Sequence, residues 1–131
     1  YVYQLIINNK KDSLHVEDIR VPVIGKLIPF VYLKYRPVND RFSNTNSMAY
    51  IKKTDDYLTQ EEMNNILLFS EKIGLDYGEL DVLRNRDDNN IYIVDVNFTP
   101  WGPPNHLSKT DRSNAQKVLA ETFHKEFLEQ L

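Results

Sequence analysis

Two strand-like runs separated by a short polar turn constrain the fold of this chain more than any other feature. Residues 77–85 and 91–97 are rich in branched and aromatic side chains, and residues 85–90 between them are all polar. Two such runs joined by a few turn-forming residues predict an antiparallel β-hairpin. The fold is therefore expected to contain an antiparallel sheet.

Strand parity predicts that acidic side chains gather on one face of this hairpin. Residues two apart on a strand share a face, which groups Asp95 and Asn97 with Ile91 and Ile93 on one strand, and Glu79, Asp81 and Leu83 on the other. A turn centred near Asp88 places Asp81 opposite Asp95. The same register places Glu79 opposite Asn97, so three carboxylates and one amide lie within reach of each other.

This predicted cluster carries an energetic cost. Like charges opposite one another across a strand pair are destabilising, and at ~4 Å with an effective dielectric near 20 each repulsion is about 4 kcal/mol. A bound cation removes that cost, and a site with only oxygen ligands suits Mg²⁺ or Mn²⁺. Two other interpretations stay open: a solvated acidic face, and a register shifted by one residue, which separates the cluster.

The remaining runs predict a larger sheet with two helices. Strand-like runs cover residues 2–7, 16–24, 27–35 and 48–52, with a tight turn at Gly25–Lys26 and a polar loop over residues 37–47. Pro22 and Pro29 lack a backbone N–H and indicate edge positions or bulges.

Helix signals appear twice. Thr59 and Glu62 form a capping-box sequence, apolar residues recur at helical spacing after it, and Gly74 stands where helices commonly end. A second amphipathic pattern over residues 115–127 predicts a C-terminal helix of about four turns. We therefore expect an α+β fold, a single domain over residues 1–131 in which two helices pack on an antiparallel sheet.

Composition excludes several classes of function. The net charge of −3 gives no reason to expect nucleic acid as a partner, and no apolar run approaches the ~20 residues that span a bilayer, so no membrane is expected either. The sequence has no cysteine, which rules out disulfides and thiolate metal sites and is compatible with a reducing, cytoplasmic location.

Two stretches around the hairpin carry a more specific pattern. Residues 74–81 read GLDYGELD, and residues 91–100 read IYIVDVNFTP. Together they resemble the metal-binding hairpin of the ATP-grasp superfamily, in which an aspartate strand is followed by an acidic-x-Asn triplet and a Thr-Pro loop. The resemblance implies that Asp81 and Asp95 hold the Mg²⁺ (or Mn²⁺) ions that bridge the β- and γ-phosphates of ATP, with Asn97 completing one of them.

The start of the chain is similar to the adenine-binding part of the same family. Its hinge strand, whose backbone meets the adenine edge, resembles Tyr3, Gln4, Leu5 and Ile6. The family often places an acidic residue on the ribose, where this chain offers only Asn8 or Asn9. The ordinary structural alternative for this run is a core strand.

Three basic residues are candidates for two phosphate contacts. Residues 18–21 resemble the family's Asp-x-Arg strand, whose arginine, here Arg20, reaches the phosphates. Lys34 or Arg36 from the strand 31–36 is expected to supply a second cationic contact, because guanidinium and ammonium groups suit phosphate oxygens. The alternative for all three is a solvated strand surface.

The loop at residues 99–104, TPWGPP, leaves the predicted metal strand directly. It is a candidate for contacting a second substrate, and the equal alternative is a rigid turn that tucks Trp101 into the core.

By this resemblance, about residues 1–107 correspond to the second, C-terminal half of an ATP-grasp module. The chain opens at Tyr1 within a strand-like run, so we expect a piece of a longer protein whose missing N-terminal half carries further phosphate contacts. The implied activity is an ATP- and Mg²⁺-dependent carboxylate–amine ligase that acts through an acyl phosphate on an unknown substrate, and the isolated piece is expected to be inactive. A kinase-like phosphoryl transferase and a non-catalytic nucleotide- or protein-binding module remain alternatives.

Overall fold

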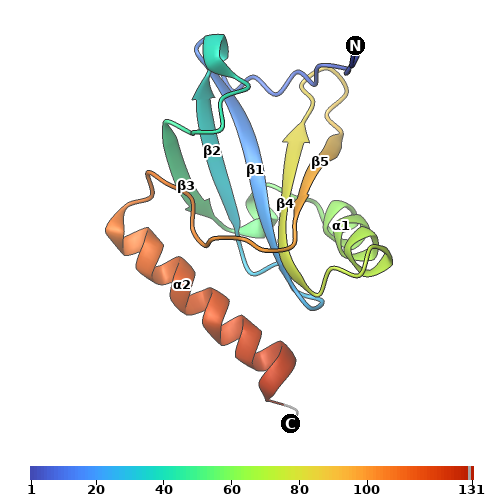
Figure 1. Ribbon diagram of the computed structural model, residues 1–131, viewed down its shortest axis with the longest axis vertical. Coiled ribbons are helices and arrows are strands. Elements are labelled where there is room, and N and C mark those ends of the chain that lie inside the picture. Colours follow the sequence, from blue (N-terminus) through green and yellow to red (C-terminus); the bar gives the residue numbers. More distant parts are fainter. Residues whose placement is uncertain (130) are drawn as a thin grey trace.

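An antiparallel sheet of five strands, in the order β3-β2-β1-β4-β5, forms the framework of the protein (Figure 1). The computed structural model describes residues 1–129 and 131. The strands are β1 (His15–Ile24), β2 (Val31–Pro37), β3 (Met48–Lys52), β4 (Tyr77–Arg84) and β5 (Ile91–Asn97). The α-helices are α1 (Gln60–Lys72) and α2 (Lys109–Phe123). Two short 3₁₀ helices, η1 (Val38–Asp40) and η2 (Thr54–Asp56), follow β2 and β3 respectively, and the π-helical segment η3 (His124–Leu128) continues α2. The predicted α+β class is confirmed. Among the described residues, no helix combines the length and apolarity needed to cross a membrane.

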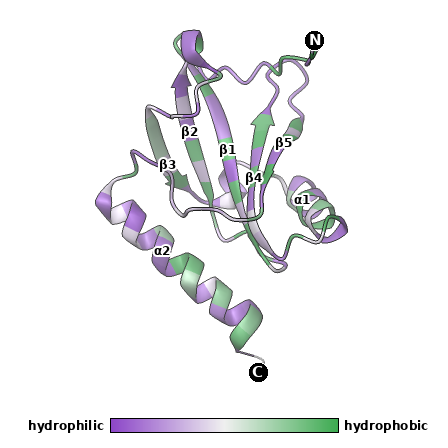
Figure 2. Cartoon of the chain, viewed as in Figure 1, coloured by the Kyte–Doolittle hydropathy of each residue, from purple (hydrophilic) through white to green (hydrophobic). Residues whose placement is uncertain are grey.

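One face of the sheet packs against α1 and forms the main apolar core. Hydrophobic and hydrophilic residues alternate along the strands (Figure 2), and the apolar set on this face includes Ile19, Val21, Val23, Val31, Leu33, Leu80 and Val82. Helix α1 adds Ile66, which is fully buried. The helix begins at the predicted capping box, in which Thr59 Oγ1 accepts from the Glu62 N–H at 3.1 Å and Glu62 Oε2 accepts from the Thr59 N–H at 3.0 Å. It ends before Gly74, whose φ of 73° suits glycine.

The opposite face is covered by α2 at one end only. A smaller apolar cluster joins Phe30 and Tyr32 to Ala115 of α2. Residues 98–108, which we call the crossing segment, run from the end of β5 across this face to the start of α2 (Figure 1). At the other end of this face, residues of the N-terminal segment lie near the polar side chains of β1, β2 and β4.

The N-terminal run 2–7 does not form the predicted strand. Its side chains are largely exposed, and the segment is held by point contacts: Arg41 Nη2 donates to Ile7 O at 2.9 Å and Asn8 Nδ2 donates to Asp87 Oδ1 at 2.9 Å. The segment leads into β1, which is already paired with β2 on one edge and with β4 on the other, so no β1 edge is left for the run to pair with.

The predicted strand 27–35 and the proline positions also need correction. Leu27 only bridges back to Ile24, and β2 begins at Val31, after Pro29. Pro22 lies in the central strand β1, not at a sheet edge. It is tolerated because the pairing of β1 with β2 ends at Arg20, so that β1 pairs only with β4 at this level.

The β4–β5 hairpin has the predicted pairs and one unpredicted bulge. Asp81 lies opposite Asp95, and Glu79 lies opposite Asn97. The register then shifts, because Val82 pairs with Ile93 and Val94 is left as an extra residue. An extra residue reverses the facing of everything beyond it. The prediction that Ile91 and Ile93 share a face with Asp95 and Asn97 was therefore wrong: both isoleucines pack against the core beneath α1.

Candidate functional site

Charged side chains from four strands gather on the face that α2 leaves partly open. They occupy alternating positions of neighbouring strands, which places them on one face by strand parity: Asp18 and Arg20 on β1, Lys34 and Arg36 on β2, Glu79 and Asp81 on β4, and Asp95 on β5. We call this set the charged cluster.

Asp81 is the centre of the charged cluster. Arg20 lies opposite Asp81 on β1. It donates from Nε to Asp81 Oδ1 at 3.0 Å and from Nη2 to Asp81 Oδ2 at 3.4 Å. Lys34 Nζ lies 3.9 Å from the same Oδ1. Glu79 Oε2 lies 3.3 Å from Arg20 Nε. The positive charge that the paired carboxylates require is therefore supplied in part by two cations from β1 and β2.

A second ion pair in the charged cluster joins Arg36 of β2 to Asp18 of β1. Arg36 Nη2 donates to Asp18 Oδ2 at 2.5 Å, and Arg36 Nη1 donates to Ser43 O at 3.3 Å. Arg36 Nε is buried and has no hydrogen-bond partner among the described residues. A buried guanidinium nitrogen with an unused donor is costly unless an acceptor reaches it, so this arginine is suited to an anionic ligand.

Burial perturbs the ionisation of three members of the charged cluster. Burial raises the pKa of Glu79 to about 7, although Arg20 opposes the shift. The hydrogen bonds of Arg20 go to Asp81. Arg20 therefore does not cancel the rise that burial causes in the pKa of Glu79. Burial also raises the pKa of Asp18, with Arg36 opposing, and lowers the pKa of Lys34, with Asp81 opposing. Groups whose pKa values are shifted by burial and by neighbouring charges are enriched at functional sites.

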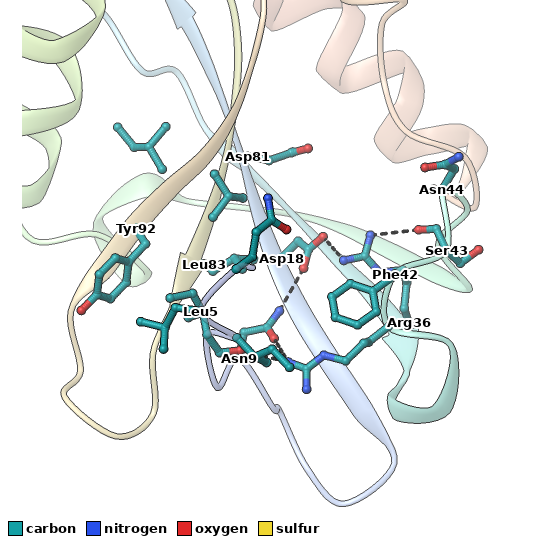
Figure 3. Close-up of a pocket in the computed structure, with 16 residues that line it drawn as sticks. Leu5, Asn9, Asp18, Arg36, Phe42, Ser43, Asn44, Asp81, Leu83 and Tyr92 are labelled. Atoms are coloured by element: carbon teal, nitrogen blue, oxygen red, sulfur yellow. Dashed lines mark hydrogen bonds and ion pairs between the residues drawn. The ribbon is translucent and has the colours of Figure 1, made fainter. Parts of the chain in front are cut away.

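A cavity of about 720 Å³ adjoins the charged cluster (Figure 3), within the size range of small-molecule sites. Its apolar walls come from the N-terminal segment and the β4–β5 hairpin: Leu5, Ile6, Ile7, Leu83, Tyr92, Ile93 and Val94. Its polar lining comes from Gln4, Asn9, Asp18, Arg36, Arg41, Ser43, Asn44 and Asp81, with Phe42 beside them. Asp18, Arg36 and Asp81 belong to both the cavity and the charged cluster.

The residues predicted to meet adenine and ribose divide into two groups. Gln4, Leu5 and Ile6 line the cavity, whereas Tyr3 is 92% exposed and does not. Asn9 lines it but is already engaged: its Nδ2 donates to Asp18 Oδ1 at 3.0 Å, and its Oδ1 accepts from Arg41 Nη2 at 2.8 Å. Asn9 therefore shapes the cavity, and its amide has little capacity left for a ribose.

The residues predicted to contact phosphate and metal differ in whether they line the cavity. Arg36 lines the cavity, while Arg20 and Lys34 reach it only through Asp81. Asp95 is exposed, and Asn97 Oδ1 accepts from the Thr99 N–H at 3.0 Å.

The oxygen ligands near Asp81 can be compared with those that a magnesium ion requires. In the part of the chain that the structure describes, no three or more His, Cys, Asp or Glu side chains are grouped to hold a metal ion. The paired Asp81 and Asp95 with the Asn97 amide still fit Mg²⁺ in donor type, because this ion keeps several waters and takes few protein ligands.

Sequence reasoning missed one part of the site and left another open. Arg41, Phe42 and Asn44 line the cavity from a stretch predicted only as a polar loop. The sequence signal for this contribution was the aromatic Phe42 between Arg41 and the polar pair Ser43 and Asn44. Trp101 is fully exposed, so the alternative that it enters the core is excluded. The crossing segment is held instead by Arg112, which donates to Pro103 O at 3.2 Å and to Pro104 O at 2.8 Å.

Comparison with known proteins adds no assignment. No family model matches the chain, and no curated protein matches its sequence.

Proposed function

We propose that the cavity binds ATP with Mg²⁺ and that the chain serves an ATP-dependent ligase of the carboxylate–amine type. The observation that carries the proposal is the junction at Asp81, where a cavity with an apolar wall meets a cluster of largely buried cations and carboxylates. An apolar pocket with a few convergent polar groups is the usual form of a small-molecule site.

The two ends of the cavity match the two ends of a nucleotide. Leu5, Ile6 and Tyr92 provide apolar surface for a purine ring. Arg36 marks the polar end, with an unused Nε donor. Guanidinium groups recognise phosphate oxygens strongly.

The metal ligands in this proposal are Asp81, Asp95 and Asn97. Bound Mg²⁺ would neutralise phosphate charge and orient the β- and γ-phosphates. Arg20 and Lys34 now contact Asp81, and both become available to phosphate oxygens when Asp81 takes a different partner.

In the proposed reaction a substrate carboxylate oxygen bonds to the γ-phosphorus of ATP, and the bond to the β,γ-bridging oxygen breaks to release ADP. An amine then attacks the acyl phosphate, and inorganic phosphate leaves. The chain contributes positioning and charge stabilisation through Arg20, Lys34 and Arg36, without a covalent nucleophile. The ATP-grasp resemblance assigns further phosphate contacts to an N-terminal half outside this sequence. A cytoplasmic location is part of the same proposal, since the chain has no cysteine.

Thermal unfolding with Mg²⁺ and a non-hydrolysable ATP analogue tests nucleotide binding. A ligand that binds only the folded state at about 100 times its Kd stabilises it by ~2.7 kcal/mol. We expect a rise in melting temperature that requires both additions. Asp81→Asn and Asp95→Asn should abolish the metal-dependent part, while the exposed control Asp55→Asn should keep it. Equal stabilisation of Asp81→Asn and the unsubstituted chain would refute the site.

One observation favours a non-catalytic nucleotide-binding module as the second candidate. Asp81 is already satisfied by Arg20 and Lys34, an arrangement that is stable without metal. Nucleotide binding that does not change on adding Mg²⁺ would support this module over the ligase and over a kinase-like phosphoryl transferase.

A further inference from the structure

Arg20 lies between two carboxylates that differ in accessibility. Its Nε is 3.0 Å from Asp81 Oδ1 and 3.3 Å from Glu79 Oε2. Asp81 is part of the cavity lining, whereas Glu79 is only 4% exposed and does not line the cavity. A ligand entering the cavity therefore reaches Asp81 and not Glu79.

The backbone fixes this geometry. Glu79 and Asp81 are two apart on β4 and so share a face, and Arg20 lies opposite Asp81 on β1. Gly78 holds β4 close to β5, because a Cβ there would lie 2.5 Å from Asn97 O. The backbone of Glu79, the next residue, is thereby held close to β5, and its side chain is buried.

Glu79 also has an unused acceptor. Its Oε2 is buried and has no hydrogen-bond partner among the described residues, because the Arg20 donors are aligned on Asp81. A buried carboxylate oxygen left without a donor is costly. While Asp81 holds the Arg20 donors, this oxygen has only the 3.3 Å ion pair with Arg20 Nε, and it can accept a hydrogen bond from Arg20 when Asp81 does not.

We propose that Glu79 is a positioning residue that retains Arg20 at the phosphate end of the cavity when Asp81 binds metal. This inference rests on the proposed function. Asp81 cannot give the same lone pairs to a metal ion and to two Arg20 donors. Glu79 then becomes the carboxylate that orients Arg20, and the guanidinium stays beside the cavity with donors directed to phosphate.

Calorimetric titration with a non-hydrolysable ATP analogue, with and without Mg²⁺, tests this role. The chain and its Glu79→Gln variant are compared in mildly alkaline buffer, and circular dichroism checks that both are folded. Without Mg²⁺, Asp81 still holds Arg20, so we expect equal affinities. With Mg²⁺, we expect Glu79→Gln to bind about tenfold more weakly, the size of one charge-assisted contact.

A double variant separates positioning from a general structural effect. In an Arg20→Gln background, Glu79→Gln should cause no further loss, because the group through which it acts is gone. The inference is overturned if Glu79→Gln loses affinity equally with and without Mg²⁺, if it loses none, or if its loss persists in the Arg20→Gln background. Failure of the unsubstituted chain to bind the analogue with Mg²⁺ would instead overturn the proposed function, and this inference with it.

Discussion

Glu79 should make the stability of the protein fall as pH rises. Burial raises its pKa in the folded state to about 7 from an ordinary value of 4.5, against the opposing effect of Arg20. The folded state therefore holds this proton more tightly than the unfolded state. For such a group, the free energy of unfolding is highest below the unfolded pKa and declines as pH rises through the interval between the two values. Above about pH 7 the full penalty of an ionised, buried Glu79 is present.

The two pKa values set the size of the effect. A separation from 4.5 to about 7, at roughly 1.4 kcal/mol per pH unit, corresponds to about 3 kcal/mol. Glu79 is almost completely buried, so solvent screening does not reduce this figure as it would for a surface carboxylate. Glu79→Gln removes the titration and keeps the side-chain shape.

Urea unfolding at a series of pH values, from about 4.5 to about 8, measures the prediction. The stability of Glu79→Gln relative to the unsubstituted chain should increase by about 3 kcal/mol across that range. Glu61→Gln, an exposed substitution on α1, serves as the control and should change stability by no more than ~0.5 kcal/mol throughout. A difference between Glu79→Gln and the unsubstituted chain that is constant with pH would refute the reasoning.

Three further substitutions test the fold and the exposed loop. Glu62→Ala removes the capping box and two 2.8 Å hydrogen bonds from Arg84, and should lower the free energy of unfolding by ~2–3 kcal/mol in urea; a loss below about 1 kcal/mol would contradict the role of this ion pair. Gly78→Ala places a Cβ 2.5 Å from Asn97 O and should destabilise by ~1–3 kcal/mol, and an unchanged melting temperature would show that β4 and β5 can separate freely. Trp101→Ala should change stability by less than ~0.5 kcal/mol, because the side chain is fully exposed; a larger loss in thermal unfolding would place Trp101 in a packed contact.

Local signals in the sequence were sufficient for some elements. Helix α1 was predicted because its capping box and apolar spacing lie within a few turns of each other, and Thr59 and Gly74 mark its ends. The pairing of Asp81 with Asp95 was predicted because the polar turn centres the hairpin. Both follow from short-range geometry.

Other features depend on tertiary context. The bulge at Val94 lets β5 present Ile93 to the α1 core and Asp95 to the charged cluster, and strand parity alone assumes an uninterrupted register. Residues 2–7 have the composition of a strand, but they lead into β1, whose two edges are already paired with β2 and β4. The contribution of Arg41 to the cavity depends on how a polar loop without periodicity folds back.

The two faces of the sheet differ in what their side chains do for stability. The face beneath α1 buries apolar residues, and this burial is the main favourable term in folding. The charged cluster contributes little by comparison, because desolvation of groups such as Asp18, Lys34 and Glu79 offsets much of their mutual attraction. Apolar residues of similar volume would often serve the fold as well. Under the proposed function, these charged groups at the edge of the cavity would meet phosphate and a divalent cation, which supply both signs of charge.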